Sequence, residues 1–191
     1  MKDCTIQSFT LHVGAGTFKP VKTIKMAEHQ MHQEYIDVDL QTLKNLLAGL
    51  NQSIIAVGTT SLRTLESLYW MGLKLHKNNN LSQTELEVKQ WEPYENENQF
   101  ISKKDAIQSI INYLEKAKLN SLRAKTGILI MPGYKFKIVN ALITNFHQPE
   151  STLILLVAAL VGQSWRKIYD YALEHNFRFL SYGDGSLLFM E

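Results

Sequence analysis

The chain has 191 residues and a formal net charge of +2, and 45% of its residues are hydrophobic and 20% charged. These values are typical of a globular protein with a real core, and the length favours one domain. The small net charge does not by itself indicate a nucleic-acid partner, which would need a local basic patch. Charged faces are usually just solvated, but two groups of basic residues could supply such a patch: Arg123, Lys125, Lys135 and Lys137, or Lys19, Lys22 and Lys25.

Cysteine usage and hydropathy bear on the compartment. Cys4 is the single cysteine, so neither an internal disulfide nor a thiolate metal cluster can form, which fits a reducing cytoplasm. The longest apolar run, residues 153–161, is far short of the roughly 20 residues of a membrane span. No charged leader followed by an apolar segment opens the chain. We therefore expect a cytoplasmic protein with no membrane partner.

The first third of the chain alternates predicted strands and helices. Residues 8–13 read as a strand that enters a glycine-rich loop, and residues 35–38 as a short strand. Asp39 can cap a helix over about 40–50, and residues 53–57 form a β-branched run typical of a buried strand. A loop at 58–61 then leads into a helix whose apolar stripe begins at Leu62.

The rest of the chain continues this alternation after a polar excursion at about 73–101, which contains one predicted strand at 86–91. Ser102 and Asp105 resemble a capping box that opens a helix through Leu114. We expect strands at 126–131 and 138–144, helices from about 150 and 164, and extended segments at 177–182 and 186–190. The alternation predicts an α/β fold with a mainly parallel or mixed sheet flanked by helices, in which polar loops gather at the carboxyl ends of the strands.

Two N-terminal motifs could line a ligand, and each has a plainer interpretation. Gly14, Gly16 and Thr17 follow the first strand, where glycine allows a ligand close to the backbone, but a plain tight turn is the favoured interpretation. Residues 29–34 place His29, His32 and Glu34 close together, so a zinc or iron site must be considered. The spacing argues against a metal, because neither a strand nor a helix puts all three donors on one face.

Three hydroxyls and an arginine follow the strand at 53–57. Thr59, Thr60 and Ser61 stand at a helix N-terminus, whose free N–H groups favour anions, and Arg63 could clamp a carboxylate or phosphate. Simple capping by Thr60 or Ser61 is the alternative. The segment lacks the lysine of a phosphate-binding P-loop, so hydrolysis of a nucleoside triphosphate is not expected.

Polar residues also crowd between the strand at 138–144 and the helix that follows. Asn145 and His147 lie there, and His147 is the best general acid or base in the chain because imidazole titrates near neutrality. A structural histidine and an asparagine that braces the turn are the alternatives. Tyr182 and Asp184 lie near the end of the chain, where Asp184 adds a carboxylate or simply forms a turn.

In this order the motifs resemble the C-terminal half of the S-adenosylmethionine:tRNA ribosyltransferase-isomerase family, which forms epoxyqueuosine. The matching blocks are LHVGAGTF at 11–18, MHQE at 31–34, AVGTTS at 56–61, RTLES at 63–67, PGY at 132–134, TNFH at 144–147, PESTL at 149–153 and YGD at 182–184. Two departures lie beside these blocks: Gln148 replaces a usually apolar residue, and Gly185-Ser186 replaces Ala-Met.

The resemblance implies that residues 1–191 form the C-terminal part of the family's larger α/β domain, an incomplete barrel-like domain, with an N-terminal portion and an inserted β-barrel domain absent. It further implies that S-adenosylmethionine donates its ribosyl group to 7-aminomethyl-7-deazaguanine at the tRNA wobble position, with release of adenine and methionine. No metal or permanently bound cofactor is implied, and we expect a monomer. The alternatives are an inactive fragment that only binds S-adenosylmethionine or RNA, and a histidine/carboxylate metallohydrolase.

The resemblance also suggests roles for the candidate residues. His147 or Glu34 would act as the base, and Asp184 as a further acid or base. Thr59, Thr60, Ser61 and Arg63 would hold an anionic group, either the methionine carboxylate or a tRNA phosphate. Asn145 and Tyr182 would lie in the same site. The residues expected to line the nucleoside are His12, Gly14, Gly16, Thr17, His29 and His32.

Overall fold

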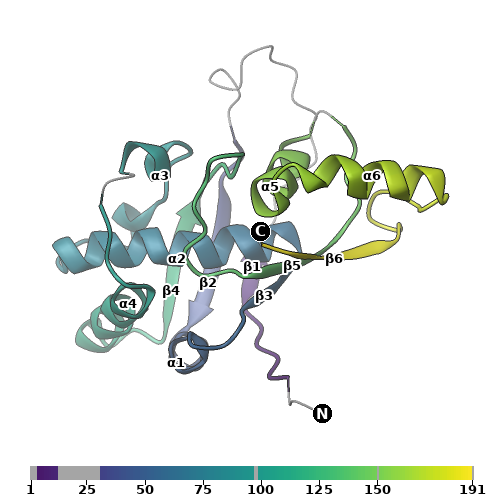
Figure 1. The fold of residues 1–191 in the computed structure, drawn as a ribbon. Helices are drawn as coiled ribbons and strands as arrows, with labels where there is room; N and C mark the ends of the chain where they lie inside the picture. Colours follow the sequence, from purple (N-terminus) through teal and green to yellow (C-terminus); the bar gives the residue numbers. More distant parts are fainter. Residues whose placement is uncertain (1–3, 13–30, 97–98, 150, 191) are drawn as a thin grey trace.

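A computed structural model describes residues 4–12, 31–96, 99–149 and 151–190. Within these ranges it contains two three-stranded sheets and flanking helices, with no closed barrel (Figure 1). The α/β class is therefore confirmed. The predicted residues Gly14, Gly16, Thr17 and His29 lie outside the described ranges.

Sheet A has the strand order β1-β2-β4, formed by β1 (Thr10–His12), β2 (Glu34–Asp39) and β4 (Ser121–Thr126), and both pairings are antiparallel. Its strands alternate strictly in burial, as expected for a sheet with one covered face. On β2, Ile36 and Val38 point into the core, whereas Tyr35 and Asp37 lie on the outer face.

Sheet B has the order β3-β5-β6, formed by β3 (Ile55–Val57), β5 (Ala141–Asn145) and β6 (Gly185–Phe189). β3 pairs with β5 in parallel, and β6 pairs with β5 antiparallel. A mainly parallel sheet is therefore not found in the described part of the chain, and the mixed alternative is correct. β3 is also not a buried strand, because Val57 lies on an open face of the sheet and at its edge.

The helix α2 (Thr59–Lys77) forms the centre of the core. Thirteen of its residues are buried, and it packs against α4 (Lys103–Ala117) and against strands of both sheets. Gly72 lies at the crossing with α4, where an added Cβ would collide with the backbone of Ala106. This close approach explains a glycine in the middle of a long helix, where it otherwise costs stability.

In Figure 1, α1 (Leu40–Gly49) lies on one side of α2, and α5 (Thr152–Val161) and α6 (Ser164–Glu174) lie on the other side. α1 contacts α4 and β2, whereas α5 packs on α6 and β6. The predicted caps of α1 and α4 are confirmed: Asp39 accepts from the Thr42 N–H at 2.8 Å, and Ser102 accepts from the Asp105 N–H at 3.0 Å. Ser151 caps α5 in the same way.

The segment from 73 to 101 contains more order than a polar excursion suggests. It includes the end of α2, the 3-10 helix η2 (Gln83–Leu86) and the short helix α3 (Glu92–Glu95). The strand predicted at 86–91 is wrong, since Val88 makes only an isolated bridge to Thr126. Leu86 and Val88 are nevertheless fully buried, so the segment is held against sheet A by its apolar residues.

Candidate functional site

The parallel pairing of β3 and β5 brings two predicted motifs together. The Gly58 N–H donates to the Ile143 carbonyl at 2.8 Å, just where both strands end. Gly58 has a φ of 89°, which favours glycine, and it is the N-cap of α2. The N-terminus of α2 therefore lies beside the Thr144-to-His147 segment, at the carboxyl ends of two strands, where ligands bind in open α/β sheets. We call this the carboxyl-end site.

The three hydroxyl residues Thr59, Thr60 and Ser61 form the first turn of α2 and are half-buried. The predicted alternative, that Thr60 or Ser61 caps the helix, is wrong because Gly58 occupies the cap and no side chain bonds there. No acidic residue lies in this first turn. The positive end of the helix dipole is thus not compensated by a carboxylate of that turn.

His147 ends the segment that follows β5 in the carboxyl-end site. Its Nε2 is 3.0 Å from the Thr144 hydroxyl, and its backbone N–H donates to the Tyr169 hydroxyl at 3.1 Å. Burial lowers the pKa of His147 to about 4, so the imidazole is neutral at neutral pH. A neutral imidazole can accept a proton, although a low pKa makes it a weak base.

Asn145 connects this site to the last turn before β6. Its side-chain amide donates to the Gly183 carbonyl at 3.1 Å. The next residue, Asp184, accepts from the Arg178 N–H at 2.7 Å and pairs with the Arg178 guanidinium at 3.2 Å. These bonds lower the pKa of Asp184, which therefore stays ionised at neutral pH. Tyr182 is 96% exposed.

Glu34 and Arg63 form an ion pair in the interior. Arg63 Nη1 lies 3.0 Å from Glu34 Oε2, with the side chains 5% and 1% exposed, and Arg63 Nε donates to the Ile128 carbonyl at 3.1 Å. Burial lowers the pKa of Arg63, and the Glu34 carboxylate opposes that shift. The expected clamp on an external anion is therefore not what the structure shows, because the guanidinium is turned inward to join α2 to β2.

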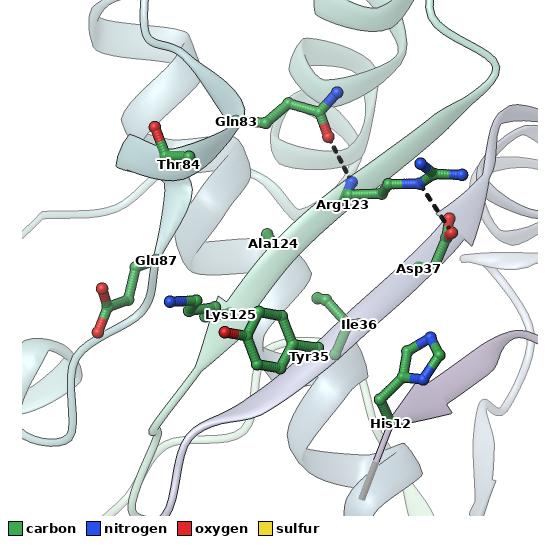
Figure 2. Close-up of a pocket in the computed structure, with 10 residues that line it drawn as sticks. All are labelled: His12, Tyr35, Ile36, Asp37, Gln83, Thr84, Glu87, Arg123, Ala124 and Lys125. Carbon is green, nitrogen blue, oxygen red and sulfur yellow. Dashed lines mark hydrogen bonds and ion pairs between the residues drawn. The ribbon is translucent and has the colours of Figure 1, made fainter.

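The predicted nucleoside-lining residues divide between two places or lie outside the described ranges. His32 is exposed, two residues before Glu34. His12 lies at the end of β1, on the outer face of sheet A, where it lines a cavity of about 680 Å³ (Figure 2). The side chains around that cavity come from all three strands of sheet A and from η2 and the residue that follows it: His12, Tyr35, Asp37, Gln83, Thr84, Glu87, Arg123 and Lys125. We call it the sheet-A groove.

Sequence reasoning assigned no role to Glu66, which is completely buried in α2. Its carboxylate accepts hydrogen bonds from the N–H groups of Lys137, Ile138 and Val139 at 2.8–3.0 Å and from the Tyr134 hydroxyl at 2.8 Å. These bonds hold the loop before β5 against α2. A carboxylate next to Leu65 on the buried side of a predicted helix was the signal that could have revealed it.

Two further findings concern metals and membranes. Among the described residues, no group of three or more His, Cys, Asp or Glu side chains is arranged to hold a metal ion. Nor does any helix in the described ranges combine the length and apolar character needed to cross a bilayer.

Comparison of the whole sequence with known proteins identifies its family. A family model described as queuosine biosynthesis protein matches residues 1–188. The chain belongs to this family. It is 39% identical over 191 residues to the S-adenosylmethionine:tRNA ribosyltransferase-isomerase of Rickettsia bellii, which covers 98% of the chain and 41% of that relative. It is 37% identical over 186 residues to the enzyme of the same name from Legionella pneumophila, covering 96% of the chain and 42% of the relative.

A solved structure was also matched. The S-adenosylmethionine tRNA ribosyltransferase of Thermotoga maritima is 28% identical, with a TM-score of 0.48, over 81% of this chain and 40% of that chain. The chain thus spans about two fifths of the length of the relatives it matches.

Proposed function

We propose that the chain supplies the carboxyl-end site of an S-adenosylmethionine:tRNA ribosyltransferase-isomerase. The reaction moves the ribosyl group of S-adenosylmethionine to 7-aminomethyl-7-deazaguanine at the wobble position of tRNA and isomerises it to give epoxyqueuosine, with release of adenine and methionine. The observation that carries the proposal is the meeting of two family blocks, residues 59–61 and 144–147, at the ends of the parallel pair β3 and β5. S-adenosylmethionine is a co-substrate, and no permanently bound cofactor or metal takes part.

His147 is the proposed base. The proton to be removed lies beside the sulfonium of S-adenosylmethionine, whose positive charge makes that proton more acidic and so suits a weak base. Because burial keeps the imidazole neutral at neutral pH, His147 can accept this proton without first losing one. The Thr144 hydroxyl, 3.0 Å from Nε2, orients the ring.

The first turn of α2 is the proposed binding place for the methionine carboxylate. Thr59, Thr60 and Ser61 are half-buried there, with hydroxyls and backbone N–H groups at the positive end of the helix. A carboxylate in this turn would lie on the side of the site that faces Thr144 and Asn145. Asn145 and Tyr182 would contact the substrate at the edge of the same site.

Glu34 and Asp184 take supporting roles in this proposal. Glu34 is paired with Arg63 in the interior and would position α2 against β2 instead of acting as the alternative base. Asp184 is ionised beside Arg178 and is therefore unsuited to be the acid that protonates departing adenine. It would fix the turn that Asn145 contacts.

The protein is proposed to act as a monomer in the cytoplasm, where its tRNA substrate is found.

Adenine release tests the proposed chemistry. S-adenosylmethionine and tRNA carrying 7-aminomethyl-7-deazaguanine are incubated with the chain, alone or together with the polypeptide that forms the remaining length of the R. bellii relative. His147→Ala should reduce adenine release by at least 100-fold, the lower range for loss of a general base. The control His175→Ala changes an exposed histidine at the end of α6 and should leave the rate unchanged.

The same assay separates an enzyme from a binding module. A module would bind S-adenosylmethionine or tRNA but release no adenine under either condition. Adenine release that depends on a metal ion and is abolished by a chelator would instead support the hypothesis of a metallohydrolase.

A further inference from the structure

The sheet-A groove, on the outer face of sheet A, is not used by the proposed chemistry. The antiparallel register aligns His12 with Tyr35 and Tyr35 with Lys125, so one row crosses all three strands. The next row pairs Asp37 with Arg123. Figure 2 shows these side chains on one side of the cavity and Gln83, Thr84 and Glu87 on the other.

An exposed aromatic ring forms the centre of the groove. Tyr35 is 53% exposed, an unusual state for a large ring on the middle strand of a sheet, and the Lys125 ammonium lies 4.9 Å from the ring centroid. Sheet faces that bind single-stranded nucleic acid use aromatic rings of this kind as platforms on which bases stack. The ring gives the groove a flat surface for a base.

Positive charge lies next to this ring. Lys125 and Arg123 are two residues apart on β4, so they lie on one face about 7 Å apart along the strand. The Arg123 side chain is 76% exposed even though its Nε is 3.0 Å from Asp37 Oδ2. A guanidinium that is paired on one edge and exposed elsewhere can still donate to a phosphate.

Polar groups on the facing wall suit the edge of a base. The Glu87 carboxylate accepts a hydrogen bond from the Gln33 side-chain amide, and the Gln83 side-chain carbonyl accepts one from the backbone N–H of Arg123. These bonds hold the wall against the sheet. Carboxylate and amide groups accept from the amino groups of bases, so the groove combines a stacking surface, a base-edge wall and a phosphate-binding side.

We propose that the sheet-A groove binds a nucleotide of single-stranded RNA, with its base against Tyr35 and its phosphate at Lys125 and Arg123. The proposal rests on the proposed function only in taking the RNA to be the tRNA substrate. The groove would thus hold the RNA strand, while S-adenosylmethionine binds at the carboxyl-end site.

Fluorescence anisotropy with a labelled anticodon stem-loop RNA tests the groove in the 191-residue chain. Tyr35→Ala should weaken RNA binding by about 5- to 150-fold, the range expected for one lost base–aromatic stack, whereas Tyr35→Phe should keep most of the affinity. Lys125→Ala should weaken binding and reduce the slope of log K against log salt by about 0.7, corresponding to one phosphate contact. The controls Tyr171→Ala and Lys167→Ala change exposed residues of the same types on α6 and should have no effect.

The outcomes separate this inference from the proposed function. Failure of the wild-type chain to bind the RNA, or groove variants that bind it no more weakly than the α6 controls, would overturn the groove. So would a Tyr35→Ala variant that loses binding of S-adenosylmethionine but keeps RNA affinity. Groove-dependent RNA binding without adenine release would leave the inference standing and contradict only the proposed function. Circular dichroism confirms that each variant is folded.

Discussion

Arg63 Nη1 lies 3.0 Å from Glu34 Oε2, in an ion pair that is almost completely shielded from solvent and joins α2 to β2. Both residues belong to family blocks that are nearly 30 positions apart along the chain. The pair fixes the start of α2, which carries Thr59 to Ser61, relative to sheet A. It therefore links the geometry of the carboxyl-end site to that of the sheet-A groove.

Removing one partner of this pair should be costly. Glu34→Gln leaves the guanidinium of Arg63 buried without its counter-charge, and we expect the free energy of unfolding to fall by about 3–5 kcal/mol in urea denaturation. The matched control is Asp37→Asn, which breaks the ion pair with Arg123 on the outer face of the same strand and should cost at most about 1 kcal/mol. Equal losses for the two variants would show that the buried pair has no special role.

The burial of His147 makes stability depend on pH. Its pKa is about 4 in the folded state against an ordinary value of 6.5, so its contribution is present above pH 6.5 and is lost as the pH falls toward 4. Between pH 7.5 and pH 5 this loss should amount to about 2 kcal/mol. Urea denaturation of wild type and His147→Asn at the two pH values isolates it, because only wild type carries this imidazole. An identical change in both proteins would contradict the burial of His147.

The buried carboxylate of Glu66 should matter for the loop before β5. Glu66→Gln presents an amide N–H₂ group to backbone donors that now have a carboxylate oxygen, so at least two hydrogen bonds are lost and the unfolding free energy should fall by about 2–5 kcal/mol. Hydrogen exchange at Ile138 and Val139 should speed up in the variant. The control is Glu95→Gln, at the end of the short helix α3, for which no change is expected. Unchanged exchange at both loop positions would exclude the anchoring role.

The crossing of α2 and α4 depends on a missing side chain. Gly72→Ala places a Cβ against the Ala106 backbone, which cannot move like the end of a flexible side chain, and should lower the thermal midpoint at a cost of about 1–3 kcal/mol. Gly49→Ala is the control, since no atom lies within 4 Å of the added Cβ and Ala favours the helix. Differential scanning calorimetry of both variants tests this, and a neutral Gly72→Ala would refute the close approach.

The helices could be predicted well because their signals are local. Asp39 and Ser102 bond to the N–H groups three residues later, and the apolar stripes that follow them have helical spacing. The strand at 126–131 was misplaced because Ile128 and its apolar neighbours are buried in an irregular segment. The actual strand, β4, alternates Arg123 and Lys125 with buried residues just before it. A continuous apolar run indicates burial, whereas alternation of polar and apolar residues indicates a strand with one exposed face.

The candidate site was predictable in part. The motifs at 59–61 and 144–147 were expected to meet at strand ends, and they do so because β3 and β5 are parallel. The inward turn of Arg63 toward Glu34 depends on how β2 packs against α2, which no local pattern encodes. No local pattern predicts the sheet-A groove either, because its residues become neighbours only through the register of three strands.

The most direct test of the proposed function is adenine release from S-adenosylmethionine in the presence of tRNA bearing 7-aminomethyl-7-deazaguanine. Three forms of the chain are assayed: wild type, His147→Ala and His175→Ala. Each is assayed alone and together with the polypeptide that forms the remaining length of the R. bellii relative. We predict tRNA-dependent release that persists in His175→Ala and falls at least 100-fold in His147→Ala. Absence of release from wild type under both conditions, or an undiminished rate in His147→Ala, would contradict it.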